Sequence, residues 1–260
     1  MTKILFMGRK WLSANLLRLL SSQDGIEIVG VLTDSHLQGS PTTAAAKELG
    51  LPLYTFDTAL EAMKEGRLKY DLGLSVLYWR KLRDEFLTIP RLGTINFHPA
   101  LLPEYKGTGG YNFTIMDELS EWGSTAHYVD ASIDTGETIE VDHFPIDAAA
   151  ETAQSLERKT MQALEPFAQR IIALAIEAQA KLPTTPNIGG RYVSRDEMEV
   201  MKQIRDGDDV EKKVRAFWFP PYDGAYVEID GQKYTLINRQ LLEEVAPKDS
   251  TSLFAGKANA

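Results

Sequence analysis

The chain has 260 residues, of which 43% are hydrophobic and 25% charged, an ordinary composition for a folded protein of one or two domains. The formal net charge is −9 and there are no cysteines, so disulfides, thiolate metal sites and cysteine nucleophiles are excluded. No apolar run is long enough to span a membrane, and residues 1–8 lack the apolar core of a signal peptide, so we expect a cytoplasmic protein without membrane contact.

The first 98 residues alternate between strand and helix patterns. Apolar runs predict strands at residues 3–7, 26–33, 51–55, 71–78 and 93–98, and helical spacing predicts helices at 11–20, 42–49, 60–65 and 81–87. This alternation predicts a Rossmann-like parallel sheet with helices on both faces. The turn after the first strand, with Gly8, Arg9 and Lys10, can present N–H groups and positive charge to an anion, although an ordinary strand–helix turn explains it equally well.

The second half predicts two further parts. Strands are expected at 126–129 and 138–144 and a long helix at 153–180, which Pro166 would kink or divide. The Pro-rich stretch after it marks a boundary, so we expect one domain at 1–182 and a small α+β module at 187–246. In the module, Asp208 would cap a helix at 209–216, and Asp230-Gly231 predicts a β-hairpin. Residues 247–260 are expected to be disordered.

Three polar residues form a candidate reaction centre. Asn96 and His98 come at the end of a predicted strand, and Asp134 stands in an Asp-Thr-Gly turn. An amide can donate to a developing oxyanion, an imidazole can do the same or move a proton, and a carboxylate can fix the imidazole or accept a proton. A hydrogen-bonded core histidine and a self-bonded turn are the structural alternatives. We assign no role to His127 or His143 and expect no metal site.

The stretch Asn96-Phe-His98-Pro-Ala-Leu-Leu-Pro, followed by Asp134-Thr-Gly, resembles the formyltransferases that use N10-formyltetrahydrofolate. The resemblance covers residues 1–180. It implies the formyltransferase fold and an enzyme in which an amine attacks the formyl carbon of the folate. By resemblance, Asn96 and His98 stabilise the oxyanion and Asp134 helps to remove the proton from the amine. Folate contacts are implied for Trp79, Arg80, Leu82 and Asp130, with a core aromatic as the alternative for Trp79.

The resemblance also bears on the amine that is formylated. Residues 107–112 resemble neither the purine-pathway branch nor the form common in the methionyl-tRNA branch, and residues 214–222 resemble the start of the C-terminal module in sugar N-formyltransferases. Residues 187–260, with 11 Lys/Arg against 13 Asp/Glu, are too short and acidic for a tRNA-binding domain. We therefore expect a nucleotide-linked amino sugar of lipopolysaccharide or O-antigen biosynthesis, no nucleic acid, and a homodimer. The residues expected to bind this substrate are Arg9, Lys10, Tyr105, Trp218, Phe219 and Tyr222.

Three alternatives stay open at this point. The first is methionyl-tRNA formyltransferase, and the second is a hydrolase that releases formate from the folate. The third is a non-catalytic protein that binds folate or a nucleotide sugar. The aromatic residues of the module would stack on a nucleobase or sugar, or else pin the module to the first domain.

Overall fold

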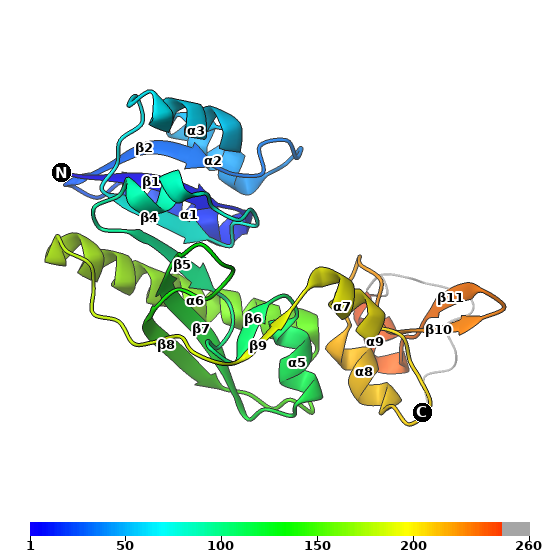
Figure 1. The fold of residues 1–260 in the computed structure, drawn as a ribbon. Coiled ribbons are helices and arrows are strands. Elements are labelled where there is room, and N and C mark those ends of the chain that lie inside the picture. Colours follow the sequence, from blue (N-terminus) through cyan, green and yellow to red (C-terminus); the bar gives the residue numbers. More distant parts are fainter. Residues whose placement is uncertain (246–260) are drawn as a thin grey trace, which may run out of the picture.

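The computed structural model describes residues 1–245, and the predicted tail at 247–260 lies outside them (Figure 1). The centre is a seven-stranded sheet with the order β3-β2-β1-β4-β5-β7-β8. The first five strands are parallel, as predicted: β1 Thr2–Gly8, β2 Ile26–Leu32, β3 Leu53–Tyr54, β4 Leu72–Val76 and β5 Thr94–His98.

The sheet differs from the prediction at its last two strands. β7 (Glu121–Tyr128) pairs antiparallel with β5, and β8 (Thr138–Pro145) pairs antiparallel with β7. The loop at 129–137 between β7 and β8 is shorter than the dozen or more residues that a parallel crossover needs. The sheet is therefore mixed, and an antiparallel pair follows the strand that ends at His98.

Helices cover both faces of the sheet (Figure 1). One layer contains α1 (Lys10–Ser21), α2 (Pro41–Glu48) and α6 (Ala153–Ala178), and the other contains α3 (Phe56–Lys64) and α4 (Asp84–Thr88). Successive side chains of β1 point to opposite faces of the sheet, so Ile4 and Phe6 pack against the first layer and Leu5 and Met7 against the second. Pro166 does not divide α6, which runs without a break.

Helix starts follow local capping rules. At the start of α6 the side chains of Thr152 and Ser155 form a reciprocal capping box. In the C-terminal module the cap of α8 (Val210–Ala216) is Asp209, whose side chain accepts from the Lys212 N–H. The prediction that Asp208 caps this helix is wrong, because its carboxylate pairs with Lys213 instead.

The C-terminal module follows a linker that runs beside the sheet. Its elements are β9 (Arg191–Val193), α7 (Arg195–Met201), α8, the hairpin β10 (Tyr226–Ile229) and β11 (Gln232–Thr235), and α9 (Arg239–Val245). β9 pairs in parallel with the short strand β6 (Tyr105–Gly107), a pairing that the sequence patterns did not predict. A separate core joins the module to α5 (Gly110–Met116). Within residues 1–245 no helix is long and apolar enough to cross a membrane.

Candidate active site

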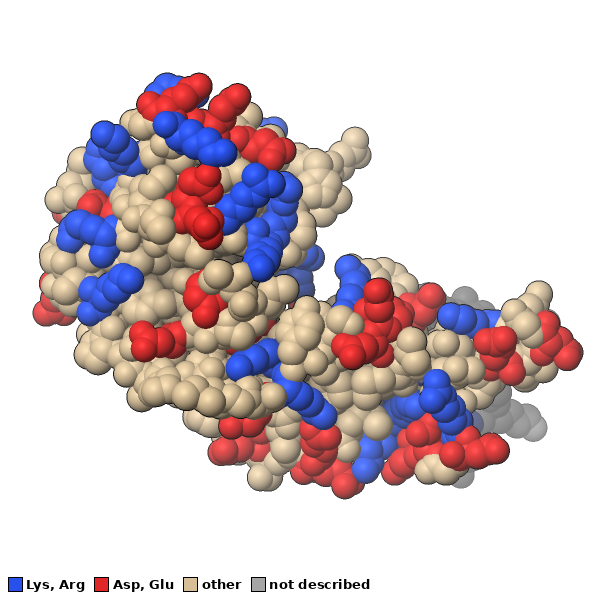
Figure 2. All heavy atoms as spheres, viewed as in Figure 1, with Lys and Arg blue, Asp and Glu red and all other residues tan. Residues whose placement is uncertain are grey.

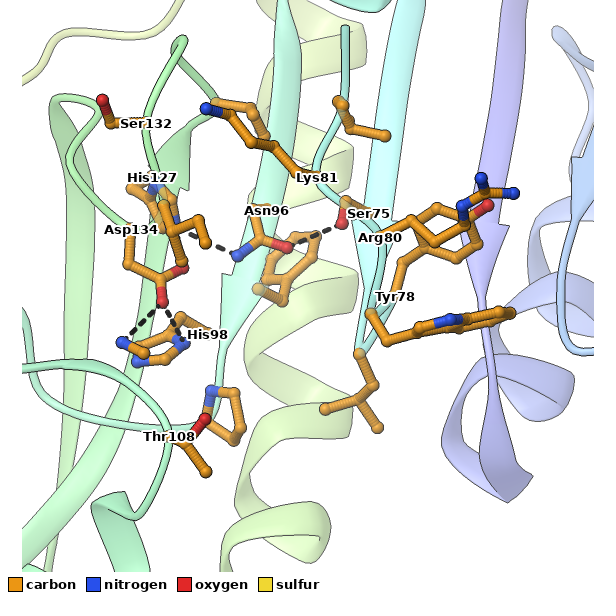
Figure 3. A pocket seen from close by; sticks show the side chains of 18 of the residues that line it. Ser75, Tyr78, Arg80, Lys81, Asn96, His98, Thr108, His127, Ser132 and Asp134 are labelled. Atoms are coloured by element: carbon orange, nitrogen blue, oxygen red, sulfur yellow. Dashed lines mark hydrogen bonds and ion pairs between the residues drawn. The ribbon is translucent and has the colours of Figure 1, made fainter. Parts of the chain in front are cut away.

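A row of polar side chains crosses three neighbouring strands. In the sheet register Ser75 of β4 lies beside Asn96 of β5, and Asn96 lies beside His127 of β7, so the three share one face. Ser75 Oγ donates to Asn96 Oδ1 at 2.7 Å, and Asn96 Nδ2 lies 3.0 Å from His127 Nε2 (Figure 3). These contacts fix the orientation of the Asn96 amide and leave its second N–H for the cavity that Asn96 lines.

His127, to which the sequence analysis gave no role, orients this row. Its Nδ1 lies 2.8 Å from the Tyr128 carbonyl oxygen, which can only accept, so we assign the proton to Nδ1 and the acceptor role to Nε2. Nε2 also lies 3.7 Å from Asp134 Oδ1. The alternation of residues along β7 could have indicated this position for His127, because Ala126 and Tyr128 pack in the core on the opposite face of the sheet.

The Asp-Thr-Gly turn brings Asp134 back to the end of β5. Asp134 itself has a positive φ of 55°. A Cβ on Gly136 would lie 1.8 Å from the Tyr128 carbonyl oxygen, so only glycine fits there. The Asp134 Oδ2 atom accepts from the Gly107 N–H at 3.0 Å and lies 3.6 Å from His98 Nδ1. The structure therefore brings Asn96, His98 and Asp134 together, as the sequence predicted.

Burial and charge set the protonation of this pair. Burial would raise the pKa of Asp134, but the positive charge that His98 and His127 carry once they are protonated at low pH, together with the Gly107 N–H, outweighs it and lowers that pKa to about 2. Burial lowers the pKa of His98, and the Asp134 charge and the Tyr105 carbonyl oppose this only in part. At neutral pH the carboxylate is therefore ionised and the imidazole neutral. Since His98 Nε2 lies 2.9 Å from the Tyr105 carbonyl, we place its proton there and leave Nδ1 basic.

Two cavities meet at His98. The first, of about 440 Å³, lies between the loop after β4 and the loop after β7. The second, of about 550 Å³, lies between α5 and the C-terminal module. Both are lined by His98, Pro99, Gly107, Thr108 and Arg195. Figure 2 shows Lys and Arg side chains on both sides of the indentation between the larger lobe and the module.

A protein-family model described as formyl transferase matches residues 2–168, more than half of the chain. The chain belongs to this family. The sequence-based recognition of a formyltransferase, and of an N-formyltransferase enzyme, is thereby confirmed.

The proteins that match this chain in sequence and those that match it in fold carry different names. The formyltransferase is 27% identical over 250 residues to the methionyl-tRNA formyltransferase of Listeria innocua, covering 91% of this chain and 78% of the relative. It is 28% identical over 250 residues to the methionyl-tRNA formyltransferase of Bacillus subtilis, covering 89% of this chain and 76% of the relative. Its fold is similar to a 4-N formyltransferase from Francisella tularensis (TM-score 0.73, 21% identity, 90% and 96% covered). It is also similar to the N-formyltransferase from Helicobacter canadensis in complex with folinic acid and dTDP-3-aminofucose, with a TM-score of 0.71 and 23% sequence identity, covering 90% of this chain and 86% of that chain.

The predicted folate residues gather at the first cavity of the formyltransferase. Trp79, Arg80, Leu82 and Asp130 all line it. The Arg80 guanidinium packs 4.2 Å from the centre of a neighbouring phenyl ring, and the Asp130 carboxylate accepts hydrogen bonds from within its own loop. The alternative for Trp79, a core aromatic, is wrong because 45% of its surface is exposed.

Only some of the residues predicted to bind the acceptor substrate line the second cavity. Lys10, Phe219 and Tyr222 line the second cavity of the formyltransferase, and Lys10 is held there by an ion pair with Glu157 at 2.5 Å. Arg9 lines neither cavity and packs against an indole ring, 5.7 Å from its centre.

Two of these predictions are wrong. Trp218 is only 7% exposed and belongs to the core that pins the module to α5. Tyr105 lines neither cavity; its hydroxyl donates to Asp117 at 3.1 Å, and the Arg191 guanidinium lies 4.9 Å from the centre of its ring. What Tyr105 contributes to the site is its backbone carbonyl, which accepts from His98.

Proposed function

We propose that this formyltransferase transfers the formyl group of N10-formyltetrahydrofolate to the amine of a nucleotide-linked amino sugar, in the synthesis of a surface polysaccharide such as O-antigen. The meeting of two cavities at His98 carries the proposal, because a two-substrate transfer needs both substrates beside one catalytic group. The solved relative that holds folinic acid and dTDP-3-aminofucose supports this pair of ligands.

The first cavity fits the folate. Leu82 and Val129 offer apolar walls to a flat ring, and Arg80 and Lys81 offer positive charge to an acidic tail. When bound, the folate would supply the formyl carbon that the amine attacks; the bond from this carbon to N10 then breaks, and tetrahydrofolate leaves with a proton on N10. The second N–H of Asn96 faces this cavity and can donate to the formyl oxygen as it gains negative charge.

The geometry favours His98 over Asp134 as the group that accepts the proton. A carboxylate with a pKa of about 2 is a weak base, whereas His98 is neutral with a basic Nδ1. When Nδ1 takes the proton from the attacking amine, the imidazolium is stabilised by the Asp134 charge on one side and by the Tyr105 carbonyl on the other. This assigns to Asp134 the support of His98 rather than the direct removal of the proton.

The second cavity suits a nucleotide sugar. Phe219 and the 65%-exposed Tyr222 offer ring faces to a base or sugar. Lys10, Arg195 and Lys202 offer positive charge to a diphosphate. Arg195 is the member of this group without an ion pair or side-chain hydrogen bond inside residues 1–245, so we assign it the contact to the phosphates.

Methionyl-tRNA formylation is the second candidate, because curated relatives with that name match most of the chain. Against it stands the charge of residues 187–260, where 11 Lys/Arg oppose 13 Asp/Glu, since tRNA binding needs a basic surface. A gel shift with initiator tRNA tests this candidate. Formate release without any amine would instead show a hydrolase.

The reaction centre is tested by separating binding from transfer. We expect His98→Asn to bind N10-formyltetrahydrofolate as wild type does by calorimetry but to transfer formyl at least about 100-fold more slowly. His143→Asn, on the exposed part of β8, is the matched control and should keep full activity. Unchanged transfer by His98→Asn would show that the reaction does not use this centre.

A further inference from the structure

The linker between α6 and α7 carries a buried amide, Asn187, that touches the catalytic turn while lining neither cavity. Its Nδ2 donates to the Asp134 carbonyl at 3.0 Å and to the Gly136 carbonyl at 2.9 Å. Both partners can only accept, so the orientation of the amide is fixed. Its Oδ1 has no hydrogen-bond partner among the described residues. This position therefore uses the two donors of the amide.

The two carbonyls belong to a turn that needs external support. Asp134 has a positive φ of 55°, a conformation that non-glycine residues keep only where their surroundings enforce it. The Asn187 donors hold the backbone on both sides of Thr135. A turn that is held at two points keeps the Asp134 carboxylate beside His98, 3.6 Å from its Nδ1 atom.

The rest of the linker is fixed on both sides of Asn187. Before it, the backbone of Thr185 exchanges two hydrogen bonds with Thr138, at 3.0 and 2.8 Å. After it, the linker leads into β9 of the module, which pairs with β6, and β6 supplies both the Tyr105 carbonyl to His98 and the Gly107 N–H to Asp134. The linker and β9 together thus contact the backbone groups that support both catalytic side chains.

We propose that Asn187 is a positioning residue that holds the Asp134 turn against His98, so that the linker to the C-terminal module sets the geometry of the reaction centre. This rests on the proposed function for the roles of His98 and Asp134. The same linker leads into α7, whose Arg195, Met198 and Lys202 line the second cavity. The segment that holds the catalytic turn is therefore continuous with the wall of the acceptor cavity.

The test uses two readouts on the full chain of Asn187→Ala, with Ile188→Ala as the matched control because Ile188 is 79% exposed. The first readout is the pKa of His98 by imidazole NMR, in a protein with 4 histidines. The Asp134 charge raises this pKa and His127 lowers it, so a displaced Asp134 should lower it further. The second is formyl transfer, where we expect kcat to fall about 10-fold or more with both KM values unchanged.

An unchanged His98 pKa and kcat in folded Asn187→Ala would overturn the proposal. If that variant does not fold, Asn187→Leu fills the space without the donors and is judged by the same two readouts. The NMR readout needs no substrate. A wild-type protein without transfer activity would therefore count against the proposed function, while the His98 titration would still decide the role of Asn187.

Discussion

At the scale of single residues, the site depends on how the Asn96 amide is oriented. An amide side chain can present its oxygen or its nitrogen to a cavity, and only the nitrogen can stabilise an oxyanion. Ser75 and His127 settle this choice, because one donates to the amide oxygen and the other accepts from the nitrogen. Neither neighbour needs to touch substrate to affect the rate.

Replacing Ser75 by alanine tests this orientation. We expect kcat to fall about 2- to 10-fold, the effect of one lost hydrogen bond, with little change in KM. Ser124→Ala is the matched control, because Ser124 is a buried serine of the same sheet whose hydroxyl has no partner among the described residues. Steady-state kinetics measure both variants. Equal kcat values in Ser75→Ala and Ser124→Ala would contradict the assigned role.

The lowered pKa of His98 makes folding depend on pH. Below the ordinary histidine pKa of about 6.5 the unfolded chain binds this proton more readily than the folded chain, so the free energy of unfolding falls as pH falls. Asp134 keeps its charge in this range because its pKa is about 2. We expect the urea midpoint to drop between pH 7.5 and pH 5.5, and to drop less in His98→Asn. Equal drops in the two proteins would show that His98 titrates normally.

At the scale of elements, the turn at 129–137 carries the Asp134 carboxylate, and the backbone of this turn has little freedom to move. The close approach of Gly136 to the Tyr128 carbonyl and the two donors of Asn187 hold the same backbone. The turn is therefore fixed from the sheet on one side and from the linker on the other.

We expect Gly136→Ala to lower the free energy of unfolding by at least about 2 kcal/mol, because the new methyl overlaps backbone that cannot move cheaply. Gly224→Ala is the control, since its nearest neighbour would lie 3.4 Å away, an ordinary contact. Urea denaturation measures both. A Gly136→Ala variant as stable as Gly224→Ala would mean that the turn shifts freely.

At the scale of the whole molecule, the C-terminal module completes the site. The larger domain alone supplies the first cavity except for Tyr192 and Arg195, whereas the second cavity needs α7 and the loop after α8. Arg195 lines both cavities from the module side. The module thus places a positive charge where the two cavities meet.

Replacing Arg195 by methionine should raise the KM for the acceptor about 10-fold and leave kcat nearly unchanged, because the lost contact binds phosphate without touching the reacting atoms. The wild-type KM should also rise with salt, since the contact is electrostatic. Arg205→Met is the control, because Arg205 is exposed and lines neither cavity. A fall in kcat alone would place Arg195 at the reacting atoms instead.

How much the sequence could predict also varies with scale. Apolar runs and helical spacing were enough to predict the parallel strands. A predicted strand end and a predicted turn were enough to indicate that Asn96, His98 and Asp134 lie together. The contacts that Ser75, His127 and Asn187 make at the site were not predicted, because they arise from strand register and from a linker that returns to the site. Aromatic character alone could not show that Trp218 enters a core while Phe219 and Tyr222 face a cavity.

Identifying the acceptor substrate tests the proposed function most directly. The protein would be mixed with N10-formyltetrahydrofolate and a panel of nucleotide-linked 3-amino and 4-amino sugars, with charged initiator tRNA in a parallel reaction, and the products would be identified by mass spectrometry. We predict a formylated nucleotide sugar, absent with His98→Asn, and no formylated tRNA. Formyl-methionyl-tRNA as the product, with every sugar unchanged, would contradict the proposed function.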